Sequence, residues 1–240
     1  MLPVQLATHE ALGAPAPFRG ASGVVAGYVP PARTPHRPIT GSGWALINGT
    51  GGAVGVPSLG GSQAGLRVYL QGAEAPLALT ARVSRALGSA HDTEVSAGYA
   101  LRARTLGLLV ERRERIDVKS GAFVVTGYGG LYDIALPLGL RVDGFAQGGL
   151  AGLRQRRWFA DGQARMTRRA AVSPRLSLGI GGGVWASAQQ GARRVEAGPL
   201  VEARVRTSSS GLRIAGEYRF RVTGDANPRS GPALTVGVDF

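Results

Sequence analysis

The chain has 240 residues, of which 28 are basic, 15 are acidic and none is cysteine, and 44% of the chain is hydrophobic. The lack of cysteine excludes disulfides, thiolate metal sites and a cysteine nucleophile. A net charge of +13 often indicates a nucleic-acid partner, but most arginines stand singly at alternate positions of expected strands. Nucleic acid is therefore not expected, and because no apolar run approaches the ~18 residues of a membrane helix, any membrane crossing must use strands.

The first 41 residues differ from the rest and are predicted to be an irregular, proline-rich linker, with residues 42–240 forming one domain. Seven of the 14 prolines fall in this segment and prevent regular structure over most of it. Only residues 22–29 could pair as a strand. No basic region precedes an apolar run of signal-peptide length, so we expect a C-terminal piece of a longer protein or a misassigned start.

From Gly43 onward, strand signals recur every dozen or so residues. The predicted strands are 43–48, 62–71, 76–87, 93–104, 106–117, 120–132, 138–152, 158–170, 174–189, 193–207, 210–222 and 232–240. In most of them apolar residues alternate with Arg, Glu, Gln, Ser or Gly, which is typical of a sheet with one apolar and one polar face. In 210–222, for example, Ile214 and Phe220 oppose Arg213 and Arg219. Segment 106–117 is expected to change phase midway.

Strand length distinguishes two folds that this alternation allows. Strands of soluble proteins average ~5–6 residues, whereas a tilted membrane strand needs ~9–11, and most of the predicted strands reach that length. We therefore predict an all-β fold: an antiparallel, up-and-down transmembrane β-barrel of about twelve strands, in the bacterial outer membrane. A soluble β-barrel that binds an acidic ligand stays open as an alternative. The outward loops, 49–61, 88–92, 118–119, 153–157, 190–192 and 223–231, are too short to plug the lumen.

The C-terminal strand carries a candidate assembly signal. Leu234, Val236, Val238 and the final Phe240 alternate with other residues. This ending resembles the C-terminal assembly signal of outer-membrane proteins, although Thr235 stands where that signal usually has glycine, and the resemblance implies recognition by the barrel-assembly machinery. More loosely, the Gly- and Arg-rich strands resemble the C-terminal barrels of tetratricopeptide-bearing polysaccharide exporters and phage-adsorption envelope proteins. That resemblance implies a periplasmic repeat region before the barrel.

Arginines on the polar face are the candidate functional residues. They are Arg67, Arg82, Arg102, Arg104, Arg141, Arg175, Arg194, Arg204, Arg206, Arg213, Arg219 and Arg221. Rings of arginine in a narrow lumen favour anions. The alternative is a closed barrel filled by pairs with Glu94, Asp143, Asp161, Glu196, Glu202 and Glu217. An open lumen is favoured by glycines expected on the same face: Gly98, Gly127, Gly129, Gly179, Gly181 and Gly183.

Two further groups are expected where the barrel meets the membrane surface. Basic residues at the outer rim either bind phosphates of lipopolysaccharide or are solvated: Arg154, Arg156, Arg157, Arg193 and Arg194. Aromatic residues are expected to join interfacial girdles: Trp44, Trp158, Phe159, Tyr218 and Phe220.

Catalysis is not expected. His9 and His36 lie in the irregular segment, and His91 lies in a short turn beside Ser89 and Asp92, where neighbours cannot take up the geometry of a triad. The run 179–183 is glycine-rich but is followed by neither a helix nor a lysine. We predict a passive pore or translocator for anionic solutes or an acidic polymer, with no cofactor and no metal. The alternatives are a filled structural or phage-receptor barrel and an autotransporter-type translocator with a helix inside.

Overall fold

The computed structural model describes residues 38–49, 59, 61–71, 76–87, 93–103, 105–117, 120–152 and 156–240. They form twelve strands and one short 3-10 helix, η1 (Pro137–Gly139). The strands are β1 (Ile39–Asn48), β2 (Gln63–Gln71), β3 (Leu77–Ala86), β4 (Thr93–Ala103), β5 (Leu106–Arg115), β6 (Ser120–Ala135), β7 (Leu140–Ala151), β8 (Arg157–Ala171), β9 (Leu176–Gln189), β10 (Ala192–Arg206), β11 (Gly211–Gly224) and β12 (Gly231–Asp239). Among these residues no helix has the length and apolar character needed to cross a membrane.

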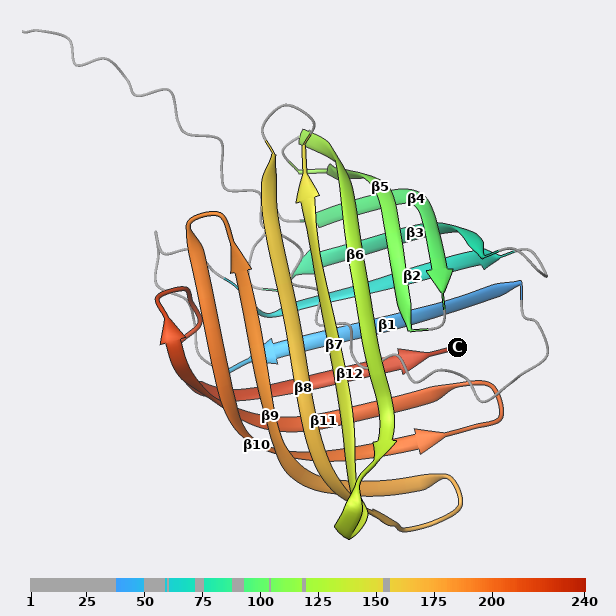
Figure 1. Cartoon of the computed structure of the whole chain (residues 1–240), viewed down its shortest axis with the longest axis vertical. Coiled ribbons are helices and arrows are strands. Elements are labelled where there is room, and N and C mark those ends of the chain that lie inside the picture. The colour runs from blue at the N-terminus through green and yellow to red at the C-terminus, as the bar shows by residue number, and fades with distance from the viewer. Residues whose placement is uncertain are drawn as a thin grey trace, which may run out of the picture.

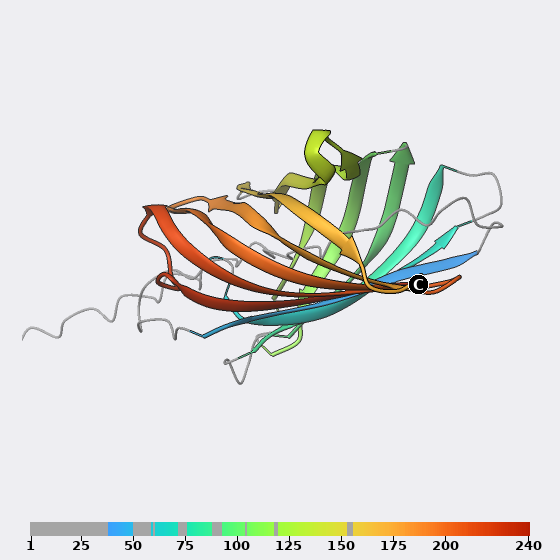
Figure 2. The same ribbon diagram turned by 90° about the horizontal axis from the view of Figure 1, so that it is seen from below.

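The strands close into a ring. Each strand pairs antiparallel with its neighbours in the chain, and β1 pairs with β12. At the seam, the backbone N–H of Gly41 donates to the carbonyl oxygen of Phe240 at 2.9 Å, and the reverse bond measures 3.0 Å. In Figure 1 strands β6, β7 and β8 form the near wall and cross β1, β11 and β12 behind them, and Figure 2 shows the strands curving round into one wall. The predicted antiparallel barrel of about twelve strands is confirmed, and closure leaves no unpaired edge.

Most strand ends lie within a few residues of those predicted, with two differences. β1 begins at Ile39, inside the segment expected to be irregular, whereas the candidate strand 22–29 lies outside the described residues. β5 is continuous from Leu106 to Arg115, so the predicted change of phase was wrong. Leu108 and Val110 point outward, and Leu109 between them is buried against Ala78 and Ala100, which explains the misleading run of apolar residues.

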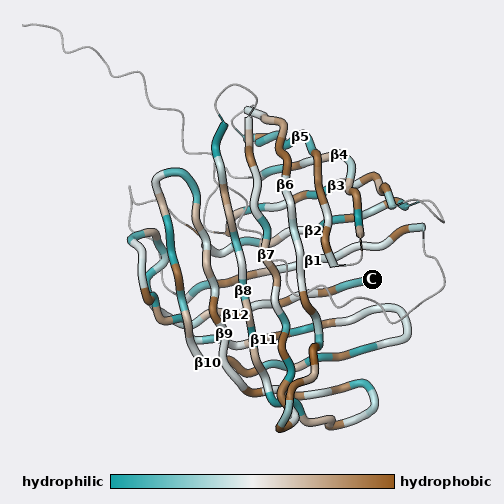
Figure 3. The backbone as a smooth tube through the Cα atoms, viewed as in Figure 1, coloured by the Kyte–Doolittle hydropathy of each residue, from teal (hydrophilic) through white to brown (hydrophobic). Residues whose placement is uncertain are grey.

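The apolar face of the sheet is the outer face. Leu106, Ile180 and Val222 are 65%, 66% and 65% exposed, whereas Glu202 and Arg213 on the inner face are 5% and 3% exposed. Figure 3 shows hydrophobic and hydrophilic residues alternating along the strands. A soluble protein buries its apolar face, so this arrangement requires lipid around the ring. The chain is a transmembrane β-barrel of the bacterial outer membrane, and the soluble alternative is excluded.

The two ends of the barrel differ. Because the strand number is even, Ile39 and Asp239 lie at the same end, together with η1; we call it the terminal end. The longest connection, residues 49–62, lies at the opposite end, which we call the far end, and long loops are typical of the extracellular side. There Leu59 is 2% exposed and packs against Ala192 and Ala226. Parts of two loops that were expected to stay outside are therefore buried in this end, where Leu59 and Ala226 pack against the inward side chain of Ala192.

Candidate functional site

The inner face of the barrel concentrates charge. Among the described residues it buries eight arginines, namely Arg67, Arg82, Arg113, Arg165, Arg194, Arg204, Arg213 and Arg219. It buries six carboxylates, namely Glu94, Glu111, Asp143, Glu196, Glu202 and Glu217. Buried charges are costly unless they are paired and hydrogen-bonded, so the contacts between these side chains determine what the interior can do.

A first group of charges lies on β2 to β5. Glu111 is its centre: Arg67 Nη1 lies 3.0 Å from Oε2, Arg113 Nη2 lies 2.6 Å from Oε1, and the Ser96 hydroxyl donates to Oε2 at 3.1 Å. Arg82 is less tightly held, since its Nη1 lies 3.7 Å from Glu94 Oε1 and its guanidinium lies 5.2 Å from the ring centroid of Trp44. We call Arg67, Arg82, Glu94, Glu111 and Arg113 the β2–β5 cluster.

A second and larger group lies on β6 to β11. Glu202 is its centre and accepts hydrogen bonds from Arg169 Nε at 2.9 Å, Arg204 Nε at 2.9 Å and Arg213 Nε at 2.8 Å. Asp143 pairs with Arg169 and lies 2.5 Å from Arg204 Nη2. The β6–β11 cluster comprises these residues and five others: Asp133 on β6, which pairs with Arg169, and Arg165, Trp185, Glu217 and Arg219. Within it the guanidinium of Arg219 lies 4.5 Å from the ring centroid of Trp185 and its Nε donates to Glu217 at 2.8 Å.

Both clusters follow the wall of the barrel. The ion pair from Arg67 to Glu111 joins strands three positions apart, and so does the pair from Arg204 to Asp143. The most distant strands that these ion pairs join are β10 and β6, through Arg206. Diametrically opposed strands of this ring are six positions apart. The ion pairs described here therefore line the interior and do not connect its opposite sides.

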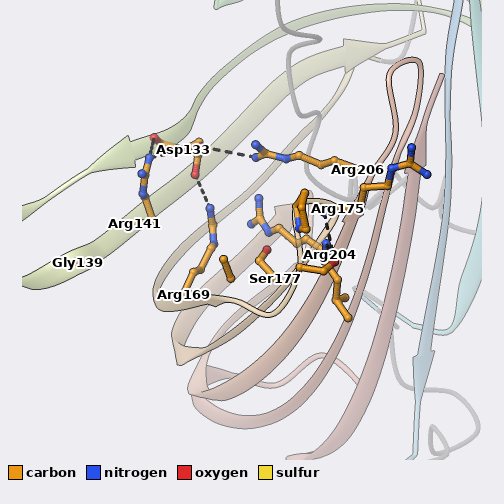
Figure 4. Close-up of a pocket in the computed structure, with 12 residues that line it drawn as sticks. Asp133, Gly139, Arg141, Arg169, Arg175, Ser177, Arg204 and Arg206 are labelled. Atoms are coloured by element: carbon orange, nitrogen blue, oxygen red, sulfur yellow. Dashed lines mark hydrogen bonds and ion pairs between the residues drawn. The ribbon is translucent and has the colours of Figure 1, made fainter.

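A pocket of about 380 Å³ opens at the terminal end. Figure 4 shows side chains of β6, β8 and β10 pointing into it together with residues of the turn between β8 and β9. Five arginines line it: Arg141, Arg169, Arg175, Arg204 and Arg206. Asp133 is the acidic lining residue, and its Oδ2 lies 3.5 Å from Arg141 Nη1 and 3.6 Å from Arg206 Nη2. Five positive charges against one carboxylate make this pocket basic.

A backbone irregularity places Asp133 in the pocket. The pairing of β6 with β7 shifts register between Leu131 and Ile134, and Asp133 takes a positive φ of 56°. Its backbone N–H donates to Asp143 Oδ1 at 3.0 Å. The bulge therefore turns the carboxylate inward toward Arg169, which strand alternation alone does not predict.

The predicted arginines fall into three groups. Arg67, Arg82, Arg194, Arg204, Arg213 and Arg219 are buried inside, and Arg141, Arg175 and Arg206 line the pocket. Arg102 and Arg221 are half-buried near the two ends, where Arg102 lies 5.0 Å from the Tyr69 ring and Arg221 Nη1 lies 3.5 Å from the Ala226 carbonyl oxygen. Arg104 lies outside the described residues.

Sequence reasoning missed four interior residues: Arg113, Glu111, Arg165 and Arg169. The expected change of phase in 106–117 concealed Glu111 and Arg113. Arg165 and Arg169 share the strand phase of Asp161, which was recognised as inward, so that phase was the signal for them. Asp161 accepts a hydrogen bond from Gln147 Nε2 at 3.2 Å.

Several predicted positions need correction. Val124 and Thr126 are buried inside, so Gly127 and Gly129 face outward, whereas the other four glycines lie on the inner face. Arg194 is 3% exposed and pairs with Glu196 inside the barrel, so it does not belong to the outer rim.

The predicted aromatic girdle divides between the two faces. Trp44 and Phe159 are 8% and 4% exposed and face the interior, so their assignment to the girdle was wrong. Trp158, Tyr218 and Phe220 do face outward, and the rings of Tyr218 and Phe220 lie 4.7 Å apart. Strand phase decides these positions, because an inward aromatic ring cannot reach the lipid.

The arginines predicted for the outer rim and the candidate assembly signal lie at opposite ends. Arg156 and Arg193 are exposed and Arg157 is half-buried at the far end, whereas Arg154 is outside the described residues. Leu234 is 40% exposed on the outer face of β12, and Phe240 is 42% exposed at the end of the chain.

The described residues include neither a histidine nor a cluster of metal ligands. They contain no group of three or more His, Cys, Asp or Glu side chains arranged to hold a metal ion. His9, His36 and His91 all lie outside the part of the chain that the structure describes.

Comparison with known proteins gives no family. No family model matches the chain, and no curated protein matches it. An outer-membrane channel from Pseudomonas putida F1 is similar over 88% of this chain and 99% of that one, at 15% identity and a TM-score of 0.44. The NanC porin covers 84% and 98% at 10% identity and 0.40. The beta domain of the Bordetella autotransporter BrkA covers 84% and 98% at 12% identity and 0.42. These similarities do not identify a function.

Proposed function

We propose that this barrel is a narrow pore for small anionic solutes. The observation that carries the proposal is the surplus of arginine on the inner face. Eight buried arginines against six buried carboxylates leave two positive charges, and the terminal-end pocket adds four further arginines against Asp133. A surplus of positive charge within a low-dielectric wall raises the local concentration of anions. Passage through such a pore is passive and involves no cofactor.

The size of the solute follows from the burial of the interior side chains. The buried arginines are at most 9% exposed, so side chains occupy much of the space at mid-depth. A small solute can pass between such side chains, whereas an acidic polymer needs a wider bore. Among the two cargoes considered from the sequence, the geometry therefore favours the small anionic solute.

A filled structural or receptor barrel is the second candidate. It is favoured by the fact that every one of the six buried carboxylates has an arginine nitrogen within 4.0 Å. Such a barrel would act through its loops. The autotransporter-type alternative has less support, because it requires a helix inside the barrel and the helical segment among the described residues is η1, three residues long.

Conductance separates the two candidates. The refolded chain is reconstituted in planar bilayers, and current steps and reversal potential are recorded under a KCl gradient. Anion-selective steps are the expected result. Steps that favour cations would contradict the proposal, and a barrel that inserts without conducting would replace it with the filled barrel.

The proposal extends to the partners of the barrel. Outward-facing arginines at the far end, Arg85, Arg112 and Arg193, would bind phosphates of lipopolysaccharide through charge-assisted hydrogen bonds. Arg112 is suited to this because it lies 5.1 Å from the Phe123 ring and bonds Glu114 at 2.6 Å, which holds it against the wall. The C-terminal strand would be recognised by the barrel-assembly machinery.

The resemblance to exporter and phage-adsorption barrels belongs to the same proposal. It would make this pore the membrane domain of a longer envelope protein whose preceding part lies in the periplasm. The terminal end, where residue 38 enters the wall, would then face that part.

A further inference from the structure

Arg165 is a buried charge, and two of its three nitrogens have no hydrogen-bond acceptor among the described residues. It lies near the middle of β8, points inward and is 3% exposed. No acceptor among the described residues bonds its Nε or its Nη1, both of which are buried. An unpaired guanidinium in a closed interior loses its hydration without replacement, which is costly. Something other than the described side chains must therefore satisfy it.

The carboxylates around Arg165 already form ion pairs with other arginines, although Glu217 Oε1 accepts no hydrogen bond among the described residues. Its acidic neighbours are Asp143, Glu202 and Glu217. Ion pairs of 3.7 Å or less join these three to four other arginines: Arg169, Arg204, Arg213 and Arg219. Arg169 also pairs with Asp133, and Arg219 lies 3.9 Å from Glu196. Counting Arg165 and every arginine that pairs with these carboxylates, eight arginines share five carboxylates, so positive charge is in surplus in this part of the interior.

The indole of Trp185 lies over Gly183 beside Arg165 and carries a second N–H donor without an acceptor among the described residues. Gly183 is the residue of β9 opposite Arg165. A Cβ on Gly183 would lie 3.3 Å from Arg165 Cγ and 2.6 Å from Trp185 Cη2, so both side chains cover this glycine. Trp185 is 4% exposed, and its buried Nε1 also lacks an acceptor among the described residues. Two side chains whose N–H donors lack acceptors among the described residues thus contact the same glycine.

We propose that Arg165 and Trp185 form a binding site for a small inorganic anion over Gly183. Water can satisfy the free N–H groups, but only an anion also neutralises the surplus charge. Arg213 supports the site, because its Nη1 also lacks a hydrogen-bond acceptor among the described residues. The role of the site in transport rests on the proposed pore, to which it adds a place where the anion rests. Its existence does not depend on conduction.

Trp185 can report on its own site, with iodide as the probe. Iodide is a small anion that quenches tryptophan fluorescence. The full-length chain with Trp44→Phe and Trp158→Phe retains Trp185 as its single tryptophan, and is titrated with iodide in detergent micelles at constant ionic strength. Acrylamide and caesium serve as neutral and cationic quenchers. The expected result is a saturable quenching by iodide, absent with the other two, that chloride or sulfate displaces competitively.

Variants in the same background localise the response. Arg165→Gln should weaken the apparent iodide affinity roughly tenfold or more, because a charge-assisted hydrogen bond is lost. Arg82→Gln removes an equally buried arginine from the β2–β5 cluster, and Arg168→Gln removes an exposed one from β8; both should leave the affinity unchanged. An equal loss in Arg82→Gln would mean a general positive potential and overturn the site.

The iodide titration of the parent chain also tests the proposed anion site when no Arg165 variant can be made. Where Arg165→Gln does not fold, saturation and competition in the parent chain support the proposal. Iodide quenching that rises linearly and resists chloride overturns it, since the donors would then be hydrated by water only. Failure of the site and failure of the pore are distinguishable: a barrel silent in bilayers can still show saturable quenching, and a conducting one can lack it.

Discussion

Arg67 on β2 reaches past two strands to Glu111 on β5, where its Nη1 lies 3.0 Å from Oε2. The two residues are 44 positions apart in the chain, and Arg82 and Ser96 occupy the intervening positions on β3 and β4. Inward side chains of this barrel therefore lean along the wall, and one carboxylate serves arginines from two different strands. The stability of the wall depends on such shared carboxylates.

Replacing Glu111 by Gln should destabilise the folded barrel by about 3–5 kcal/mol, because Arg67 and Arg113 would remain buried without their counter-ion. Urea unfolding in lipid vesicles, followed by tryptophan fluorescence, measures the change in unfolding free energy. Glu114→Gln is the matched control: its pair with Arg112 is almost half exposed, so the expected loss is at most about 1 kcal/mol. Equal losses in the two variants would contradict the role given to Glu111.

The outward position of the apolar face predicts a cost that depends on depth. Val184 lies at mid-strand on β9 and is 48% exposed, and Val222 lies near the far end of β11 and is 65% exposed. Val184→Arg should cost about 2–4 kcal/mol, because it places a charge in the hydrocarbon core, and Val222→Arg about 0–1 kcal/mol. The same vesicle unfolding assay measures both. If the two variants lost equal stability, β9 and β11 would not be placed in the bilayer as described.

The basic pocket at the terminal end predicts a selectivity that salt screens. Combined reversal of Arg141, Arg175 and Arg206 to Glu should lower the preference for anions, because these side chains lie at the pocket surface. The effect should be large near 0.1 M salt and small at 1 M, where the Debye length falls from about 10 Å to about 3 Å. Reversal potentials at the two concentrations measure it. Arg168→Glu, an exposed outward position on β8, should leave selectivity unchanged; a shift there would assign selectivity to the membrane surface.

Closure of the ring predicts a role for the last residue. The ring of Phe240 covers Gly41 across the β1–β12 seam, since a Cβ on Gly41 would lie 2.7 Å from Phe240 Cε2. Phe240→Ala removes this contact and should slow folding into vesicles and lower the folded fraction, read from the mobility of unboiled samples on gels. Ile39→Ala, at the same end and 54% exposed, is the control. If both variants folded equally slowly, the effect of Phe240 would come from general apolar contact with lipid and not from closure of the seam.

Sequence reasoning was most accurate where only one strand was involved. The alternation in 193–207 and 210–222 correctly predicts that Arg204, Arg213 and Arg219 point inward, since side-chain direction in a strand follows from position parity. It failed where parity is broken or ambiguous. Three consecutive apolar residues concealed the inward position of Leu109, and the bulge before Ile134 brought Asp133 into the pocket.

The amino-acid sequence by itself determined the number of strands, their lengths and the presence of one apolar and one polar face, because these depend on neighbours along the chain. Only the tertiary structure decided which charges meet. Arg204 and Asp143 are 61 residues apart and come together because β7 and β10 are held at one stagger around a closed ring. The same stagger leaves Arg165 opposite Gly183 with its neighbouring carboxylates engaged elsewhere. In a closed ring the stagger of all strands together sets the distances between these side chains, so these distances cannot be predicted from any single segment of the sequence.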